Sequence, residues 1–264
     1  MSDFERTAAT APFGQTVGRA GSVAVDEGLR AYMLRIYNYM VLGLAITGLA
    51  ALGTYMLSVT ADPTLAALKL RDGLMLTGFG KTLFVSPLKW VVIFAPLGLV
   101  LLLSFGIERL RPAAAQLVFW IYAALVGVSL ASIFMVFTHT SVVRVFFITA
   151  ASFGALSLWG YTTQRDLTGM GSFLLMGLFG IILASLVNLF MASSGLQFAI
   201  SAIGVVVFAG LTAWDTQRLK TEYLYGAMDG ETAERASIIG ALTLYLNFIN
   251  LFTLLLQLLG QRDE

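Results

Sequence analysis

The chain has 264 residues, of which 58% are hydrophobic and 12% are charged, and its net charge is +1. Soluble domains contain about 45–50% apolar and about 25% charged residues, so this composition excludes an ordinary soluble domain and indicates an integral membrane protein. The balanced charge gives no reason to expect a nucleic-acid partner. The chain has no cysteine and a single histidine, His139, which excludes disulfides, a cysteine nucleophile and a multi-histidine metal site. We therefore expect no metal site and no cofactor.

The N-terminal segment differs in composition from the rest of the chain. Residues 1–33 are polar and rich in glycine and alanine, and they include several arginines. We predict that residues 1–33 form a polar N-terminal tail and that residues 34–260 form the transmembrane domain.

Seven segments after the tail are long and apolar enough to cross a bilayer, which takes about 20 residues for a helix. These segments are residues 36–59, 89–107, 113–137, 142–162, 171–192, 196–214 and 238–259. The pattern predicts an all-α integral membrane protein, a bundle of seven transmembrane helices. Pro96 predicts a kink in the second span. Residues 60–88 are expected to form a long loop, and His139 is expected in a turn between the third and fourth spans.

The distribution of lysine and arginine predicts the orientation, because these residues concentrate in cytoplasmic loops. With the N-terminus in the cytosol, ten basic residues fall on the inner side and six on the outer side. The inner set is Arg6, Arg19, Arg30, Arg35, Arg109, Arg111, Arg165, Arg218, Lys220 and Arg235, and the outer set is Lys69, Arg71, Lys81, Lys89, Arg144 and Arg262. Seven spans then place the C-terminus outside. A re-entrant last segment would return it to the cytosol, and the sequence leaves this alternative open.

The candidate functional residue is Asp215, which ends the apolar run of residues 199–213. Ionisable groups at membrane depth are costly and usually have a function. If the helix continues beyond this point, Asp215 and Arg218 lie three residues apart on one face and can interact. The alternative is an exposed carboxylate at a helix end in the headgroup region.

Amides in the later spans are candidate neighbours of this carboxylate. Asn247 and Asn250 lie on one face of the last span, and Asn188 lies in the fifth. Buried amides in lipid need hydrogen-bond partners, which packed helices supply. One interpretation is a packing contact between helices, and the other is an Asp215–Asn247 contact that lines a water-filled path.

Four segments resemble the Bax inhibitor-1 family, and its bacterial branch most of all. They are residues 28–40, 161–168, 210–220 and 240–252, and the resemblance extends over about residues 26–260. It implies seven helices with the last near the centre, a pH-sensitive calcium leak, and cytoprotective roles in eukaryotic relatives. In the family, two aspartates on the last two helices form a proton-sensing pair. Asp215 matches the first, whereas the position of the second is Asn247 in this chain.

This departure changes the expected chemistry of the pair. Two carboxylates that share a site titrate as a coupled pair, whereas a carboxylate beside an amide binds one proton. A site with one carboxylate should also attract calcium less strongly than a site with two aspartates, because Ca²⁺ favours several oxygen ligands, often carboxylates. We therefore expect a single-proton pH response. The family's gating arginine has no match by motif; Lys89 and Arg109 are candidates by position only.

The leading functional hypothesis is a pH-sensitive cation leak channel in the bacterial cytoplasmic membrane, with calcium as the expected ion. Asp215 would gate it through protonation, with Asn247 as its partner and Arg218, Asn250 and Asn188 as neighbours. The alternative is a membrane interaction protein that modulates other membrane proteins, such as a membrane-bound protease. Membrane lipid is an expected partner in either case.

No enzyme signature is present in the sequence, so we expect no catalytic residues. There is no His-Glu-x-x-His pair, no phosphate-binding loop and no serine with a plausible base. An intramembrane protease would need two aspartates within spans or a serine–histidine pair. Secondary transport also lacks support, because the sequence has no evident inverted repeat.

Overall fold

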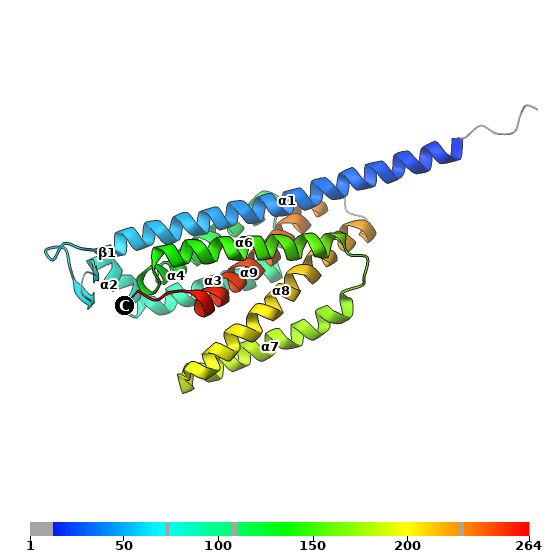
Figure 1. Cartoon of the computed structure of the whole chain (residues 1–264). Helices are drawn as coiled ribbons and strands as arrows, with labels where there is room; N and C mark the ends of the chain where they lie inside the picture. Colours follow the sequence, from blue (N-terminus) through cyan, green and yellow to red (C-terminus); the bar gives the residue numbers. More distant parts are fainter. Residues whose placement is uncertain (1–12, 72–73, 107–109, 227–229, 264) are drawn as a thin grey trace, which may run out of the picture.

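Nearly all of the described chain is helical. The computed structural model describes residues 13–71, 74–106, 110–226 and 230–263, and only the backbone of residues 13–26, 71 and 102–105 (Figure 1). The helices are α1 (Phe13–Ser58), α2 (Gly78–Phe84), α3 (Leu88–Gly106), α4 (Pro112–Leu130), α5 (Ile133–Val136), α6 (His139–Thr162), α7 (Thr168–Met191), α8 (Ser194–Tyr225) and α9 (Gly230–Leu259). The strands are β1 (Val59–Thr60), β2 (Leu68–Arg71) and β3 (Leu74–Leu76).

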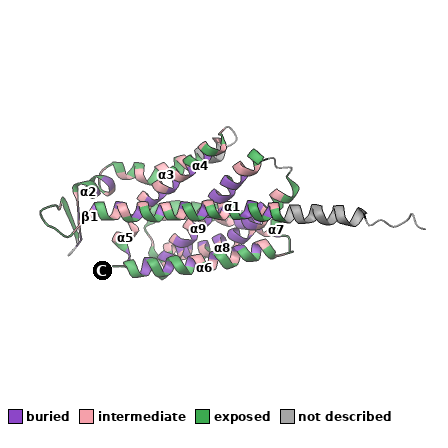
Figure 2. Ribbon diagram, turned by 90° about the horizontal axis from the view of Figure 1, so that it is seen from above, coloured by how far each residue is buried: buried purple, intermediate pink, exposed green. Residues whose placement is uncertain are grey.

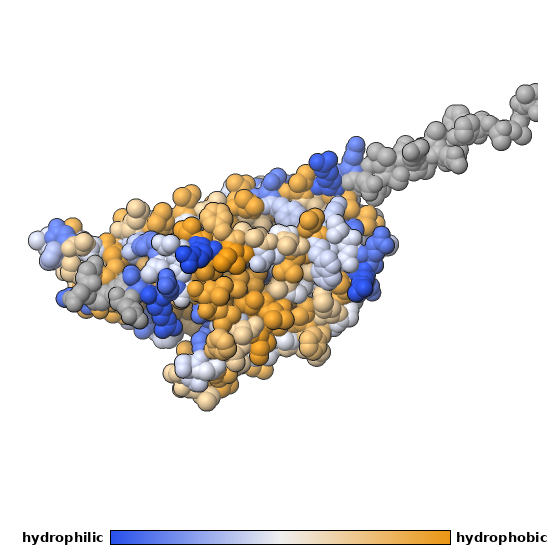
Figure 3. Space-filling model, viewed as in Figure 1, coloured by the Kyte–Doolittle hydropathy of each residue, from blue (hydrophilic) through white to orange (hydrophobic). Residues whose placement is uncertain are grey.

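The helices confirm the membrane class predicted from composition. Within the described residues, six helices are long and apolar enough to span a bilayer. Helix α2 and residues Leu88–Leu101 of α3 together meet the same criterion, but they are bent by 59° at their junction, as in a broken span or a re-entrant loop. Figure 3 shows hydrophobic residues over the middle of one face, with hydrophilic residues towards both ends. The protein is therefore a bundle of up to seven spans.

Two predicted loop features are wrong. Residues 60–88 are not a plain loop, because they hold an antiparallel sheet of order β1-β3-β2 followed by α2. Thr77 caps α2: its hydroxyl accepts from Gly80 N at 3.1 Å and donates to Leu57 O at 2.8 Å. His139 is not in a turn but begins α6, where its ring packs edge-on against Tyr55 at 5.2 Å. Short strands and caps leave little trace in hydropathy, which explains both errors.

Helices α1, α8 and α9 extend beyond the apolar segments that predicted them. Helix α1 begins at Phe13, so residues 13–33 of the predicted tail are helical and continuous with the helix of the first span, and residues 1–12 lie outside the described residues. Helix α8 continues to Tyr225, well past the predicted end at residue 214. The additional turns are polar, and a search for apolar runs does not detect them.

Helix α9 lies at the centre of the bundle, as predicted. It packs against α1, α4, α6 and α8, and 56% of its most apolar stretch is buried, against 11% for α7. Figure 2 shows the buried residues gathered where these helices meet. Tyr245 of α9 is fully buried, with Phe119 and Tyr122 edge-on to its ring. Its hydroxyl lies 2.6 Å from Thr47 Oγ1 on α1.

The two ends of the described chain lie at opposite ends of the bundle (Figure 1). Helix α9 is unbroken, and the residues after it pair with the turn before α6. Thr138 N donates to Gln261 O at 3.0 Å, and Asp263 N donates to Val136 O at 3.0 Å. The last span is therefore not re-entrant, and the C-terminus lies at the end of the bundle that carries the sheet.

Candidate functional site

The predicted contact between Asp215 and Asn247 is present in the structure. Asn247 Nδ2 donates to Asp215 Oδ2 at 2.8 Å, and the two residues are only 5% and 4% exposed. Because α8 continues for ten residues past Asp215 to Tyr225, the carboxylate lies within a helix and not at its end. The alternative of an exposed headgroup carboxylate is wrong.

Arg218 occupies the other oxygen of the same carboxylate. Its Nη2 lies 2.9 Å from Asp215 Oδ1, one helical turn away, and 46% of its side chain is exposed. The guanidinium also lies over the ring of Trp214, 5.0 Å from the ring centroid. A buried charge needs a paired partner with hydrogen-bonding geometry. Here both carboxylate oxygens are engaged, and the charges of Asp215 and Arg218 cancel.

A close crossing of α6 and α8 positions this part of α8. Gly160 lies against the α8 backbone: a Cβ there would come 2.2 Å from Ala213 O. Beside this crossing, Ser157 Oγ lies 2.9 Å from Thr216 Oγ1, next to Asp215 in the chain. Only the absence of a side chain at Gly160 permits this distance between the two backbones.

The turn after Asp215 is tied to the loop between α6 and α7. Gln217 Oε1 accepts from Leu167 N at 2.9 Å, and its Nε2 donates to Arg165 O at 2.7 Å. Lys220 Nζ donates to Tyr161 O at 2.9 Å. Sequence reasoning did not single out Gln217, although it lies in the segment 210–220 that carries the family resemblance.

Asp166 in this loop caps the start of α7. Its Oδ1 accepts from Thr168 N at 2.9 Å. The hydrogen bonds from the Thr168 side chain and backbone hold the pKa of the Asp166 carboxyl below its usual value. The loop next to the candidate site is thus fixed at several points.

A second polar cluster lies at the other end of α8. Asn188 Nδ2 donates to Gln197 Oε1 at 3.0 Å, and Gln197 Nε2 donates to Gln257 Oε1 at 2.6 Å. Ser201 Oγ donates to the same Gln257 oxygen at 2.7 Å. Asn188 therefore contacts a neighbouring helix. Gln197 and Gln257 were missed because each stands near the end of its span.

One groove of about 580 Å³ between α7, α8 and α9 connects the two polar clusters. Asp215, Arg218 and Asn247 line it towards one end, and Gln197 and Gln257 line it towards the other. The residues of the groove with polar side chains are Ser185, Gln197, Asp215, Arg218, Thr243, Asn247, Asn250, Thr253 and Gln257. The predicted neighbour Asn250 lines this groove, and its Nδ2 donates to Leu246 O of its own helix at 2.8 Å.

The described residues contain no cluster of three or more histidine, aspartate or glutamate side chains that could hold a metal ion. Of the two cations considered as gating residues, Lys89 lies at the start of α3 over the Trp90 ring, and Arg109 is outside the described residues. The cation paired with Asp215 is Arg218.

Comparison with known proteins decides the family. The family described as "Inhibitor of apoptosis-promoting Bax1" matches residues 29–264. The chain belongs to the Bax inhibitor-1 family. It is 46% identical to the uncharacterized protein RP147 of Rickettsia prowazekii over the whole of both chains. It is 43% identical to the inner membrane protein YbhL of Escherichia coli K12, over 89% of this chain and 93% of that protein. The chain is thus an integral inner membrane protein of this family.

The segments that carry the Bax inhibitor-1 resemblance meet around the candidate site. A Cβ at Gly240 of α9 would lie 2.9 Å from Leu219 Cδ2 of α8 and 3.0 Å from Ile36 Cδ1 of α1. Lys220 binds the end of α6 through Tyr161. With the Asp215–Asn247 contact, these interactions bring the four segments together at one end of the bundle.

Proposed function

We propose that this protein is a cation leak of the Bax inhibitor-1 type, with calcium as the expected ion, opened by protonation of Asp215. One observation carries the proposal: a single buried carboxylate is held on one oxygen by Asn247 of α9 and on the other by Arg218. Ionisable residues within membrane spans often mark ion pathways. We interpret the state in which both oxygens of Asp215 are bound, and α8 is thereby held to α9, as the closed state of the gate.

The electrostatics explain how protonation would open the gate. The ionised carboxylate attracts the guanidinium of Arg218 and accepts from Asn247, which ties α9 to α8. A protonated carboxyl is neutral and loses most of its attraction for Arg218. Because the Arg218 side chain is already 46% exposed, it can turn towards water while its stem stays on the protein. The α8–α9 contact is then weakened at this level of the groove.

The polar side chains of the groove supply the path. Asn250, Thr253 and Gln257 of α9 line it beyond the gate, and Gln197 of α8 faces them. Amide and hydroxyl oxygens stabilise a partly hydrated cation without holding it firmly. A site with one carboxylate binds Ca²⁺ weakly, as suits passage rather than storage.

Ion flux in liposomes tests the proposal. The purified protein is reconstituted around a calcium-sensitive dye, and influx is measured from about pH 5 to about pH 8. We expect influx in the unaltered protein to rise at acid pH with the steepness of one proton. Asp215→Asn should make influx independent of pH, because an amide cannot ionise. Asp166→Asn is the matched control, since this exposed acid lies outside the groove. Influx that keeps its pH dependence in Asp215→Asn would refute the proposal.

The second candidate function, a membrane interaction protein, is favoured by the exposure of α7. This helix packs mainly on α8, and only 11% of its most apolar stretch is buried in the chain itself. Its outward face could pack on a helix of another membrane protein, such as a membrane-bound protease. Absence of flux, together with a protease that co-purifies and is lost when Phe179 on this face is changed to Ala, would favour this function.

A further inference from the structure

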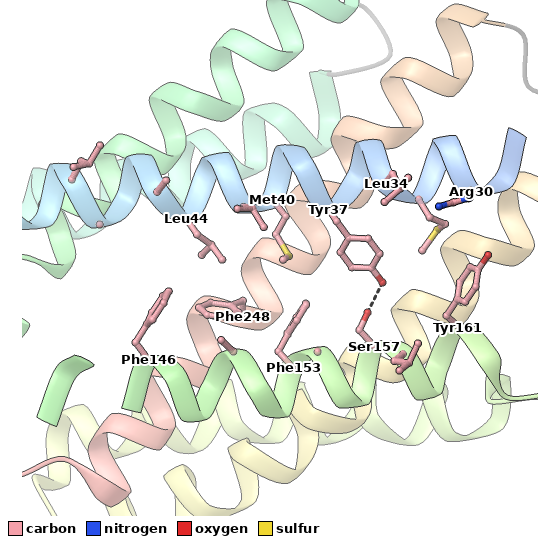
Figure 4. Close-up of a pocket in the computed structure, with 18 of the residues that line it drawn as sticks. Arg30, Leu34, Tyr37, Met40, Leu44, Phe146, Phe153, Ser157, Tyr161 and Phe248 are labelled. Carbon is pink, nitrogen blue, oxygen red and sulfur yellow. Dashed lines mark hydrogen bonds between the residues drawn. The ribbon is translucent and has the colours of Figure 1, made fainter. Parts of the chain in front are cut away.

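A second groove, separate from the candidate gate, runs along the outside of the bundle between α1 and α6. Its volume is about 1140 Å³, and nearly all of its lining is apolar (Figure 4). Leu34, Met40 and Leu44 line it from α1, and Phe146 and Phe153 line it from α6. Phe248 of α9 contributes to it as well. Several lining side chains are also exposed, Leu34 by 51% among them, so the groove is open to the bilayer.

Apart from the Tyr37–Ser157 pair, the polar side chains that line the groove lie towards one end. Arg30 and Tyr161 line that end, where Figure 4 places both beyond the apolar side chains. Lys220 lies near this end but does not line the groove: its Nζ is 5.1 Å from the centroid of the Tyr161 ring and donates to Tyr161 O at 2.9 Å. Arg30 is exposed and makes no ion pair among the described residues. Glu27, one turn earlier on α1, is exposed and does not line the groove.

The length of the apolar part fits one leaflet. From Arg30 to Leu44 the helical rise amounts to about 21 Å. Half of a bilayer, with its headgroup region, measures roughly 20–22 Å. A molecule that places an anionic group at Arg30 would therefore leave an acyl chain along Leu34, Met40 and Leu44.

We propose that this groove binds one anionic phospholipid, with its phosphate on Arg30 and one acyl chain between α1 and α6. The charge of the mouth selects the anionic headgroup, and the apolar walls accept the chain. Tyr37 is the one polar side chain of α1 that crosses the groove, and its hydroxyl lies 2.5 Å from Ser157 Oγ, so its polar atom is already occupied (Figure 4). This leaves Arg30 as the group that recognises the phosphate. The proposal does not depend on ion conduction.

Lipid titration of the purified protein tests it. Phosphatidylglycerol and phosphatidylcholine of equal chain length are added to detergent-solubilised protein, and bound lipid is counted by native mass spectrometry. We expect one phosphatidylglycerol to bind more tightly than phosphatidylcholine. Arg30→Ala should weaken phosphatidylglycerol binding about tenfold, the effect of losing one charge-assisted hydrogen bond. Arg35→Ala is the matched control, because Arg35 is exposed on the same helix and does not line the groove.

A second pair of variants tests the apolar part. Gly154 lines the groove with open space beside it, so Gly154→Leu fills the groove without a clash and should abolish binding of the lipid. Gly180→Leu, at an equally open position on α7 outside the groove, should leave binding unchanged. Equal effects of Arg30→Ala and Arg35→Ala would overturn the headgroup assignment. A dimer that disappears in Gly154→Leu would assign the groove to a second copy of the chain and overturn the proposal.

Discussion

Replacing Gly160 by alanine should loosen the contact between α6 and α8 beside the candidate gate. The added Cβ would lie 2.2 Å from Ala213 O, where ordinary contacts begin near 3.4 Å. The two helices must then separate by about 1 Å, and such overpacking costs about 1–3 kcal/mol. At about 2–4 °C per kcal/mol, the midpoint of thermal unfolding should fall by roughly 2–12 °C.

The matched control is Gly154→Ala, on the same helix but with open space at its Cβ. Alanine favours helix over glycine by about 0.5–1 kcal/mol, so this variant should unfold at the same or a slightly higher temperature. The assay is thermal unfolding of both variants in the same detergent, followed by tryptophan fluorescence. Equal midpoints for Gly160→Ala and Gly154→Ala would refute the reasoning, because they would show that the close crossing does not limit packing.

Three further predictions concern the site and its supports. Asn247→Asp should add a second proton to the pH response of ion flux, because a carboxylate in place of the amide that now contacts Asp215 would titrate with it as a coupled pair. Tyr245→Phe should lower the free energy of unfolding by about 1 kcal/mol, because it removes the hydroxyl that is hydrogen-bonded to Thr47. Chemical denaturation measures this change. Asp166→Ala should lower the unfolding temperature at pH 7. Because the pKa of Asp166 is lowered in the folded protein, its ionised carboxylate stabilises the fold at any pH above the ordinary pKa of an aspartate. This stabilisation is lost as the pH falls through the folded pKa, so the unfolding temperatures of the unaltered protein and of Asp166→Ala should become equal in acid.

Each of these three has its own control. Asn38→Asp adds a carboxylate at an exposed position of α1 and should leave the proton number of the flux unchanged. Tyr225→Phe removes a hydroxyl from a side chain that is 86% exposed and should not change stability. For Asp166→Ala, a stability difference that persists unchanged from pH 7 into strong acid would contradict the role of the ionised carboxylate.

Much of the candidate site could be predicted from the sequence because its members are unusual residues in an apolar setting. An aspartate at the end of a long apolar run is costly in lipid, and Asn247 stands out for the same reason. The contact between them needed the family resemblance as well, because the two residues are 32 positions apart in the chain. The role of Arg218 followed from helical spacing once α8 was taken to continue.

The supports of the site were not predictable in the same way. Gln217 is a polar residue beyond the apolar run, and nothing local indicates that its two amide atoms hold the backbone of a distant loop. Gln197 and Gln257 lie near span ends, where exposed amides are common, and only the packing of α8 on α9 brings them together. The sheet in residues 59–76 was missed because its strands are two to four residues long.

The sequence by itself determined the membrane class, the number of apolar segments and the unusual acid among them, because each depends on the transfer of side chains from water to lipid. The tertiary structure alone decided which groups meet. Helices in lipid associate through close packing and hydrogen bonds at particular positions. The approach of α6 at Gly160 and the central position of α9 therefore fix the partners of Asp215, and no count of apolar residues contains that information.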